Sequence, residues 1–284
     1  MVVDTIFFDL DDTLVLTSDH DKPSFAAACA LAKERKPAID DVAMLAAFKK
    51  RFSATPWDPD YKVEVAQWRA NLWNEAMQEQ GLADPDVALE IQNCFDQTRM
   101  GIFTWVEGVP EMIAQLKAAN YKMCIITNGH HKVQHDKLDA CKAADIFEHI
   151  IVGGDEVLEG NPEKPAASIF LKACQMVRCT PENAIHVGDS LSSDIQGAIN
   201  ASLAGSVWVN RKNAEAPEAP VPTYTVQVVT ELPEVLAKLR GKSKVQLAMV
   251  VVVAVLFLVK FRLSEGLWTP HFSRRQKKPS PFRG

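Results

Sequence analysis

Paired or clustered cysteines are missing from this sequence. None of its six cysteines forms a C-x-x-C pair, and none stands at zinc-site spacing from another cysteine or a histidine. Several lie within apolar runs, where a free thiol packs like a small hydrophobic side chain. The first ten residues also lack the basic segment that begins a secretory signal peptide. We therefore expect reduced thiols and a cytoplasmic location for the body of the protein.

Positive charge is scarce over most of the chain. The protein has 284 residues, enough for one large domain or two smaller ones, and 47% of them are hydrophobic. Residues 1–240 contain 22 Lys/Arg and 35 Asp/Glu, a net charge of −13, whereas residues 241–284 contain nine Lys/Arg and one acid, a net charge of +8. Because nucleic-acid binding needs a basic face, the acidic body is a poor candidate, and we expect no nucleic-acid partner.

The basic tail contains a long apolar run at residues 245–261, which is 17 residues long and includes Gln246 and Lys260. A bilayer span usually needs about 17–25 residues, so this run is at the lower limit. Basic residues on both sides give no clear orientation. A buried C-terminal helix is disfavoured because the predicted core is complete near Leu239. Two interpretations stay open: a single tail anchor that brings the protein to a membrane, or a variant, non-native C-terminus.

Strand-like and helix-like segments alternate after residue 103. Before it, a β-branched and aromatic run at the N-terminus is typical of a buried strand, and residues 23–99 show apolar side chains at three- and four-residue spacing. Strands are expected at Val2–Phe8, Met123–Ile126, His149–Val152, Ala184–Val187 and Ser206–Val209. Helices are expected at Phe25–Arg35, Val42–Phe52, Tyr61–Gln80, Val87–Arg99, Val109–Ala119, Val133–Ala140, Lys164–Val177, Asp194–Ala201 and Leu232–Leu239.

This alternation predicts an α/β fold with a doubly wound parallel sheet, interrupted by an all-helical insert. Ligands of such sheets bind at the carboxyl ends of the strands, where the strand order reverses. Polar residues follow several of the predicted strands, and Lys164 directly precedes a proline that begins a helix. The polar positions are Asp9, Asp11, Thr127-Asn128-Gly129, Lys164, Gly188-Asp189 and Asp194. We expect them to meet in one crevice.

These residue types suit the transfer of a phosphoryl group. A carboxylate can attack phosphorus and form an acyl phosphate. A second carboxyl group two residues on can protonate the leaving oxygen and later deprotonate water. Mg²⁺ prefers oxygen ligands, which paired carboxylates and a substrate phosphate provide, while hydroxyl, N–H and ammonium groups hold phosphoryl oxygens. Each motif alone is more often a turn or a surface residue, but all of them together, in this order, favour a phosphatase.

On these residues the sequence resembles the haloacid dehalogenase-like superfamily. The four motifs of that superfamily are matched by Asp9-Leu10-Asp11-Asp12-Thr13-Leu14, Thr127-Asn128-Gly129, Lys164, and Gly188-Asp189 with Asp194. The match runs over most of residues 1–240. The resemblance implies a Rossmann-like core made of residues 1–17 and 104–240, an inserted all-helical cap domain at residues 18–103, and a tail at residues 241–284.

The resemblance also implies a role for each motif residue. Asp9 would be the nucleophile that forms an aspartyl-phosphate intermediate, and Asp11 would be the general acid and base. Mg²⁺ would be bound by Asp9, by the main-chain carbonyl of Asp11 and by Asp189, while Asp194 would orient these ligands. The phosphate contacts would come from Leu10, Asp11, Thr127, Asn128 and Lys164, some of them through main-chain N–H groups.

Other segments resemble one branch of the superfamily, which dephosphorylates sialic acid 9-phosphate. They are Phe7–Asp11, Ile151–Gly154, Glu163–Pro165, Ser168–Phe170, Asp194–Gly197, Trp68-Arg69, Trp73–Ala76 and Thr98-Arg99. The implied partner is therefore a small phosphorylated sugar acid. Arg69 and Arg99 of the insert are either surface charges or partners for its carboxylate. The loop at 155–162 is longer than expected before Lys164, which weakens the substrate assignment and leaves the chemistry intact.

Several alternatives compete with a sugar-acid phosphatase. The same chemistry could act on phosphoglycolate, a nucleotide or another sugar phosphate. A non-catalytic, membrane-tethered protein is disfavoured because Asp9, Asp11, Lys164 and Asp189 occur together. A dehalogenase is disfavoured because a halide leaves without a proton, which would give Asp11 no role. The histidines His130, His131 and His135 fit a solvated helix face better than a metal site.

Overall fold

The computed structural model describes residues 3–215 and 218–240. Within them, six strands form a sheet in the order β3-β2-β1-β4-β5-β6, and every pairing is parallel. The strands are β1 Thr5–Phe8, β2 Lys122–Thr127, β3 Ile150–Val152, β4 Ala184–Gly188, β5 Gly205–Val209 and β6 Tyr224–Val226. The predicted doubly wound parallel sheet is confirmed, and the short β6 adds a strand that the sequence pattern did not predict.

The central strand β1 lies between β2 and β4 and is buried along its whole length. Each of its residues is β-branched or aromatic, the types that favour a strand. Its last residue, Phe8, pairs with Ile125 of β2 on one side and with Val187 of β4 on the other. The strand order reverses at β1, so the residues that follow β1, β2 and β4 emerge next to one another. This edge of the sheet is the expected place for a ligand.

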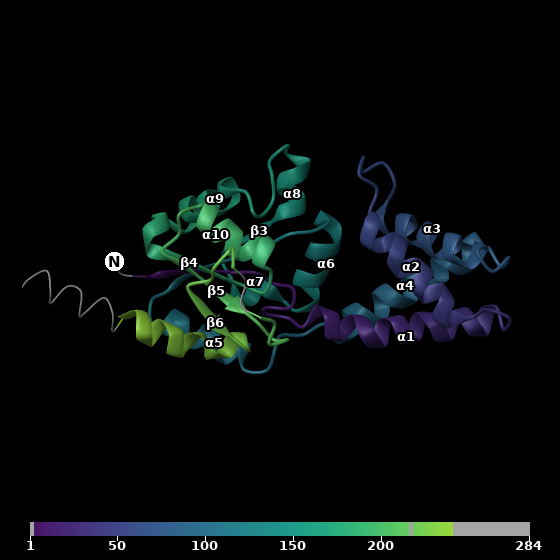
Figure 1. The fold of residues 1–284 in the computed structure, drawn as a ribbon, viewed down its shortest axis with the longest axis horizontal. Coiled ribbons are helices and arrows are strands. Elements are labelled where there is room, and N and C mark those ends of the chain that lie inside the picture. The colour runs from purple at the N-terminus through teal and green to yellow at the C-terminus, as the bar shows by residue number, and fades with distance from the viewer. Residues whose placement is uncertain (1–2, 216–217, 241–284) are drawn as a thin grey trace, which may run out of the picture. The chain divides into compact units, whose positions relative to one another are not determined.

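Helices flank the sheet, with α9 and α10 on one face and α5 on the other (Figure 1). The helices that follow β1, β2, β3 and β4 connect the parallel strands. They are α5 Val109–Ala118, α6 His131–Ala140, α7 Ala143–Ile146, α8 Gly153–Leu158, α9 Ala167–Val177 and α10 Gln196–Asn200. Short turns of 3₁₀-helix lie at η1 Pro181–Asn183 and η3 Val229–Glu231, a π-helical turn at η2 Leu191–Ile195, and residues 232–240 are helical.

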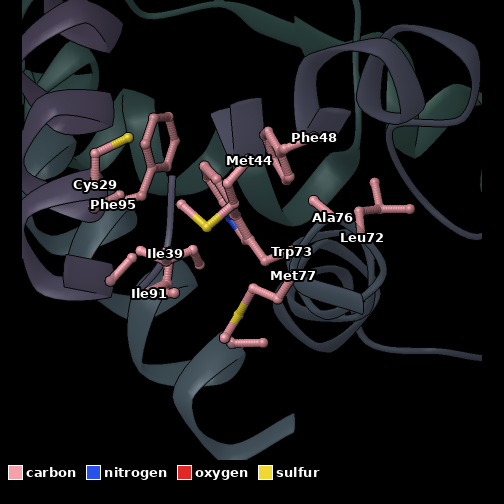
Figure 2. Packing of buried hydrophobic residues seen from close by; sticks show 13 residues of the cluster. Cys29, Ile39, Met44, Phe48, Leu72, Trp73, Ala76, Met77, Ile91 and Phe95 are labelled. Atoms are coloured by element: carbon pink, nitrogen blue, oxygen red, sulfur yellow. The ribbon is translucent and has the colours of Figure 1, made fainter. Parts of the chain in front are cut away.

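Five helices lie between β1 and β2 in the chain, and the first four of them form the insert. They are α1 Thr17–Arg35, α2 Asp41–Ala54, α3 Val65–Gln78 and α4 Pro85–Ile102. In this insert, α1 packs on α4, and α3 packs on both α2 and α4. Figure 2 shows the hydrophobic cluster that their apolar faces share. A cluster separate from the sheet gives the insert a core of its own.

Trp73 of α3 is fully buried in this cluster, beside Phe48 and Met44 (Figure 2). Its ring stacks on Phe48 with centroids 3.7 Å apart. Its indole N–H donates to Gln92 Oε1 over 3.1 Å, so the one polar atom of the side chain is satisfied. Full burial of a large aromatic side chain contributes about 1.5–3 kcal/mol, which makes Trp73 a principal support of the insert.

Several elements differ from the sequence-based expectation. Helix α3 begins at Val65 rather than at residue 61, α9 begins at Ala167 rather than at residue 164, and the short α7 was not predicted. Helix α1 begins at Thr17 rather than at residue 25, with Pro23 inside it. Asp12 accepts a hydrogen bond from Ser18 N over 3.0 Å, so a side chain before the proline already satisfies the first turn of this helix. The predicted loop at 155–162 is helical in its first part, because α8 runs from Gly153 to Leu158.

The tail prediction cannot be compared with the structure, because residues 245–261 lie outside the described residues. Within residues 3–215 and 218–240, none of the helices combines the length and apolar character needed to cross a membrane. The tail anchor therefore stays a prediction.

Candidate active site

Asp9 lies at the carboxyl end of β1 and is 6% exposed. Its main-chain N–H donates to Val187 O over 2.9 Å, which extends the pairing of β1 with β4 to this residue. The ammonium of Lys164 lies 2.6 Å from Asp9 Oδ1 and 2.7 Å from Asp194 Oδ1. The structure thus brings residues from three distant parts of the sequence into contact.

Asp194 is held from three directions. Lys164 contacts its Oδ1, His186 Nε2 lies 2.9 Å from the same oxygen, and Ser190 N donates to Oδ2 over 3.0 Å. Burial alone would raise the pKa of Asp194, but the charge of Lys164 and the contact with His186 outweigh it and lower that pKa. Burial lowers the pKa of His186, which favours a neutral ring that donates Nε2–H.

The carboxylates of Asp9, Asp189 and Asp194 form a candidate metal site, with one oxygen from each within 4.8 Å of the others. Burial, and to a smaller extent neighbouring carboxylates, raise the pKa of Asp9 well above its usual range although Lys164 opposes this shift. Burial likewise raises the pKa of Asp189 to about 7, with Asp194 adding to it. Three carboxylates against one ammonium leave excess negative charge, and their oxygen donors fit a hard divalent cation such as Mg²⁺.

Gly188 is required for the close approach of Asp194 to the end of β4. A β-carbon at Gly188 would lie 2.3 Å from Asp194 Cγ, which no real contact allows. Asp189, next in the chain, also lines a cavity of about 150 Å³ together with Trp208 and Arg211. The end of β4 is thus shaped to place two carboxylates beside Asp9.

Asp11 points to a different set of partners. Its two carboxylate oxygens lie 2.7 and 2.8 Å from the ammonium of Lys137, Gln134 Nε2 donates to Oδ2 over 2.8 Å, and Thr17 Oγ1 donates to Oδ1. Burial raises the pKa of Asp11, but the charge and hydrogen bond of Lys137 outweigh it, so the pKa is lowered. The two aspartates of the first motif therefore occupy opposite electrostatic surroundings.

The predicted phosphate-binding residues gather beside Asp9. Asn128 Nδ2 donates to Lys164 O over 2.7 Å, and Lys164 N donates to Asn128 Oδ1 over 3.0 Å, which joins the loop after β2 to the segment before α9. Gly129 has a φ of +121°, a conformation that favours glycine. Thr127 and Leu10 are both fully buried. Because the side chain of Leu10 is apolar, Leu10 could contact a ligand oxygen only through its main-chain N–H.

Arg99 is 5% exposed, so a surface charge is the wrong interpretation for it. Its Nη1 lies 3.4 Å from Asp21 Oδ1 and its Nη2 lies 3.6 Å from Asp96 Oδ1. Its Nε and Nη2 have no hydrogen-bond partner among the described residues. Buried polar groups are normally hydrogen-bonded, so these two donors of Arg99 are an exception that an acceptor would satisfy.

Arg69 is also 5% exposed, and a surface charge is wrong for it as well. Its Nε donates to Pro56 O over 3.3 Å, and its guanidinium carbon lies 5.1 Å from the ring centroid of Phe52. Burial, followed by the like charge of Arg99, lowers the pKa of Arg69 to about 10. Two buried cations near each other are unfavourable unless anions offset them, and Asp96 and Asp21 do so only in part here.

The histidines also differ from the expected solvated face. His130 is 6% exposed and stacks on His131 and Tyr61, with centroids 4.6 and 5.3 Å apart. Burial lowers the pKa of His130 to about 4, so its ring is neutral at physiological pH. His135 is exposed as predicted and pairs with Asp155. The loop between α2 and α3, which carries Tyr61, therefore contacts the segment that follows Gly129.

Sequence reasoning missed Lys137, Gln134, Thr17 and His186. His186 left a signal, since a histidine inside a short apolar strand must find a buried partner. Gln134 and Lys137 left a weaker signal in the sequence, because polar residues three positions apart on a helix share a face. Nothing in the linear pattern linked that face to Asp11, which is more than 120 positions away.

Residues 3–202 match the haloacid dehalogenase-like hydrolase family. The human N-acylneuraminate-9-phosphatase is 33% identical over 250 residues, covering 84% of this chain and 96% of that protein. The glyceraldehyde 3-phosphate phosphatase of Pyrococcus furiosus is 30% identical over 246 residues, covering 85% of this chain and 95% of that protein. Both matches span nearly the whole length of the relatives.

Solved structures agree with the fold. A hydrolase of the same family, YfnB from Bacillus subtilis, superposes with a TM-score of 0.61 at 22% identity, covering 83% of this chain and 99% of that one. That hydrolase was solved with magnesium bound. At this identity the likeness shows the fold alone.

Proposed function

The chain belongs to the haloacid dehalogenase-like hydrolase family and is a phosphoric monoester hydrolase, and from this premise we propose that it hydrolyses N-acylneuraminate 9-phosphate to free sialic acid and phosphate. The observation that carries the chemistry is the contact of Lys164 with both Asp9 and Asp194 beside Asp189. The substrate rests on 33% identity to the human enzyme of that name over 84% of this chain.

The first step is an attack by the Asp9 carboxylate on phosphorus. The bond between phosphorus and the leaving oxygen breaks, and a proton passes from the carboxyl group of Asp11 to that oxygen. Asp11 must take up a proton before this step, which the charge of Lys137 disfavours in the substrate-free protein. Water then attacks the aspartyl phosphate, Asp11 takes the proton of the water, and the Asp9–phosphorus bond breaks. Asp9 is restored and phosphate is released.

The other motif residues hold the phosphoryl group during these steps. Thr127, Asn128 and Lys164 contact its oxygens, together with main-chain N–H groups at Leu10 and Asp11. Asp9, the main-chain carbonyl of Asp11 and Asp189 would hold Mg²⁺. Asp194 lies in the same carboxylate group, but both of its oxygens already accept hydrogen bonds, and it orients Lys164. When bound, Mg²⁺ supplies positive charge that lets an anionic nucleophile approach an anionic phosphate.

The insert at 18–103 acts as a cap domain on the core of residues 1–17 and 104–240 in this proposal, and its buried arginines select the substrate. Arg69 and Arg99 bind the carboxylate of the sugar acid, because a planar guanidinium matches a carboxylate with two parallel hydrogen bonds. The unpartnered Nε and Nη2 of Arg99 support this role.

A second candidate is a phosphatase of the same mechanism for another small substrate, such as phosphoglycolate, a nucleotide or another sugar phosphate. The match to the glyceraldehyde 3-phosphate phosphatase favours this candidate, because it spans as much of the chain as the sialic acid relative does. A cytoplasmic location of the catalytic part stays a prediction under both candidates.

Phosphate release from a panel of phosphomonoesters tests the proposal. The purified protein should show its highest kcat/KM on N-acylneuraminate 9-phosphate, lose activity in EDTA and regain it with Mg²⁺. A higher kcat/KM on glyceraldehyde 3-phosphate, phosphoglycolate or a nucleotide would replace the substrate and leave the chemistry in place. Full activity in EDTA would contradict the metal-dependent mechanism.

A further inference from the structure

The carboxylate of Asp11 is surrounded by donors from two helices. Lys137 and Gln134 come from α6, and Thr17 comes from the start of α1. Among the described residues, no hydrogen bond to this carboxylate comes from the group that holds Asp9. The two motif aspartates are thus held by separate parts of the molecule.

In the described part of the chain, Lys137 makes its one ion pair within 4 Å with Asp11, and Asp21 is the next anion that its charge affects. Its side chain is 8% exposed, and both of its short contacts go to the oxygens of Asp11, at 2.7 and 2.8 Å. Burying an ammonium costs several kcal/mol unless it is paired, so a buried lysine needs a reason. The helix would gain more from an apolar residue here if packing were the only requirement.

Gln134 joins Asp11 to the phosphate-binding loop. Its side-chain nitrogen lies 2.8 Å from Asp11 Oδ2, 2.6 Å from Thr127 Oγ1 and 2.5 Å from Asn128 O. Gln134 is 1% exposed, and its two amide N–H groups are shared among these three oxygens, while its Oε1 has no hydrogen-bond partner among the described residues. One side chain therefore fixes the distance between the Asp11 carboxyl group and the loop that is expected to hold the phosphate.

We infer that Lys137 and Gln134 are positioning residues for the acid and base step, which they serve by fixing the carboxyl group of Asp11 beside the phosphate loop. The inference rests on the proposed function, in which Asp11 protonates the leaving oxygen. As the O–H bond of Asp11 breaks and the leaving oxygen gains the proton, Asp11 becomes a carboxylate. Lys137 serves this step only through Asp11, whose carboxyl group it holds in place over 2.7 and 2.8 Å without touching the substrate.

The dependence of the rate on the leaving group tests this role. A p-nitrophenolate leaves without a proton, whereas the alkoxide of an alkyl phosphate needs one. Release of the leaving group in the first turnover separates this step from hydrolysis of the aspartyl phosphate. In Lys137→Met, first-turnover release from the alkyl phosphate should fall by about tenfold or more, and release of p-nitrophenolate by no more than about threefold.

A matched control comes from the same helix. Lys132 is exposed and pairs with Asp136, so Lys132→Met removes an ammonium from α6 without touching Asp11. Both release rates should stay at the wild-type level in this variant. An equal fall for both substrates in Lys137→Met, or a faster release from the alkyl phosphate, would overturn the inference.

The Asp11→Asn background separates this inference from the proposed function. With no acid to position, adding Lys137→Met should change both release rates by no more than about twofold. The double variant also serves if Lys137→Met alone folds poorly, because it leaves no unpaired carboxylate buried at position 11. If Asp11→Asn lowers the first-turnover release rate equally for both substrates, Asp11 is not the acid, and the mechanism and the inference both fail. If Asp11→Asn discriminates between the substrates and Lys137→Met does not, the inference alone fails.

Discussion

The carboxyl edge of the sheet and the helical insert bury charge in different ways. At the sheet edge, Lys164 contacts both Asp9 and Asp194 at 2.6 and 2.7 Å. In the insert, Arg99 is as deeply buried, yet its Nε and Nη2 have no hydrogen-bond partner among the described residues. Its ionic contacts, at 3.4 and 3.6 Å, are longer than those of Lys164.

This difference suggests two kinds of site. Paired buried charges hold their geometry before a ligand arrives, as a catalytic centre requires. Buried cations with unpartnered donors gain free energy when an anion enters, as a recognition site requires. We therefore interpret the sheet edge as the place of chemistry and the two arginines as the place where substrates are distinguished. Three variants test this division.

Asp9→Asn should have the largest effect on activity and a small one on stability. An amide cannot form the acyl phosphate, so phosphate release should fall to background with every substrate. Because burial raises the pKa of Asp9, removing its negative charge should leave the melting temperature in metal-free buffer unchanged or higher. Steady-state phosphate release and thermal unfolding measure the two quantities.

The control for this variant is Asp136→Asn, which removes an exposed carboxylate from α6. It should retain both activity and melting temperature. Near wild-type phosphate release from a folded Asp9→Asn protein would show that the nucleophile is another residue, and the sheet edge would lose its assigned role.

His186→Met should have an intermediate effect. It removes the ring N–H that lies 2.9 Å from Asp194 Oδ1. Asp194 then loses one of the contacts that hold its carboxylate in place beside Lys164. Loss of such a supporting hydrogen bond typically costs about 10–100-fold in activity or metal affinity. Measurement of kcat and of the Mg²⁺ concentration for half-maximal activity, both against wild type, tests this expectation.

His186→Gln should recover part of the loss, because an amide N–H can replace the ring N–H. His135→Met, a change at an exposed histidine, should have no effect. If methionine and glutamine at position 186 reduce activity equally and lower the melting temperature to the same extent, the ring serves packing against Phe170 instead.

Arg99→Ala should have the smallest and most selective effect. A hydrogen bond to a charged group contributes about 1.5–3 kcal/mol, so kcat/KM for N-acylneuraminate 9-phosphate should fall by about tenfold or more. A neutral sugar phosphate should be affected far less, and Arg69→Ala should behave in the same way. Arg35→Ala, which removes an exposed arginine of α1, is the matched control. Equal losses for acidic and neutral substrates would show that the arginines do not distinguish them.

The residues at the strand ends were within reach of sequence reasoning. Asp9, Thr127 and Asp189 follow apolar runs, and parallel strands bring their carboxyl ends to one edge, so proximity follows from the fold class. The helical insert was predictable from its three- and four-residue spacing. Short elements such as α8 and β6 were missed because tertiary contacts outweigh local propensity in segments of this length.

The sequence by itself determined the alternating sheet, the insert and the identity of the groups that can perform phosphoryl transfer, because these depend on local periodicity and on chemistry at strand ends. Only the tertiary structure decided how each group is held. It brought Lys137 and Gln134 into hydrogen-bond contact with Asp11, and His186 into contact with Asp194. It also buried Arg99 with two donor atoms that have no hydrogen-bond partner among the described residues. These contacts join positions far apart in the chain, and burial is a property of the packed fold that no local pattern contains.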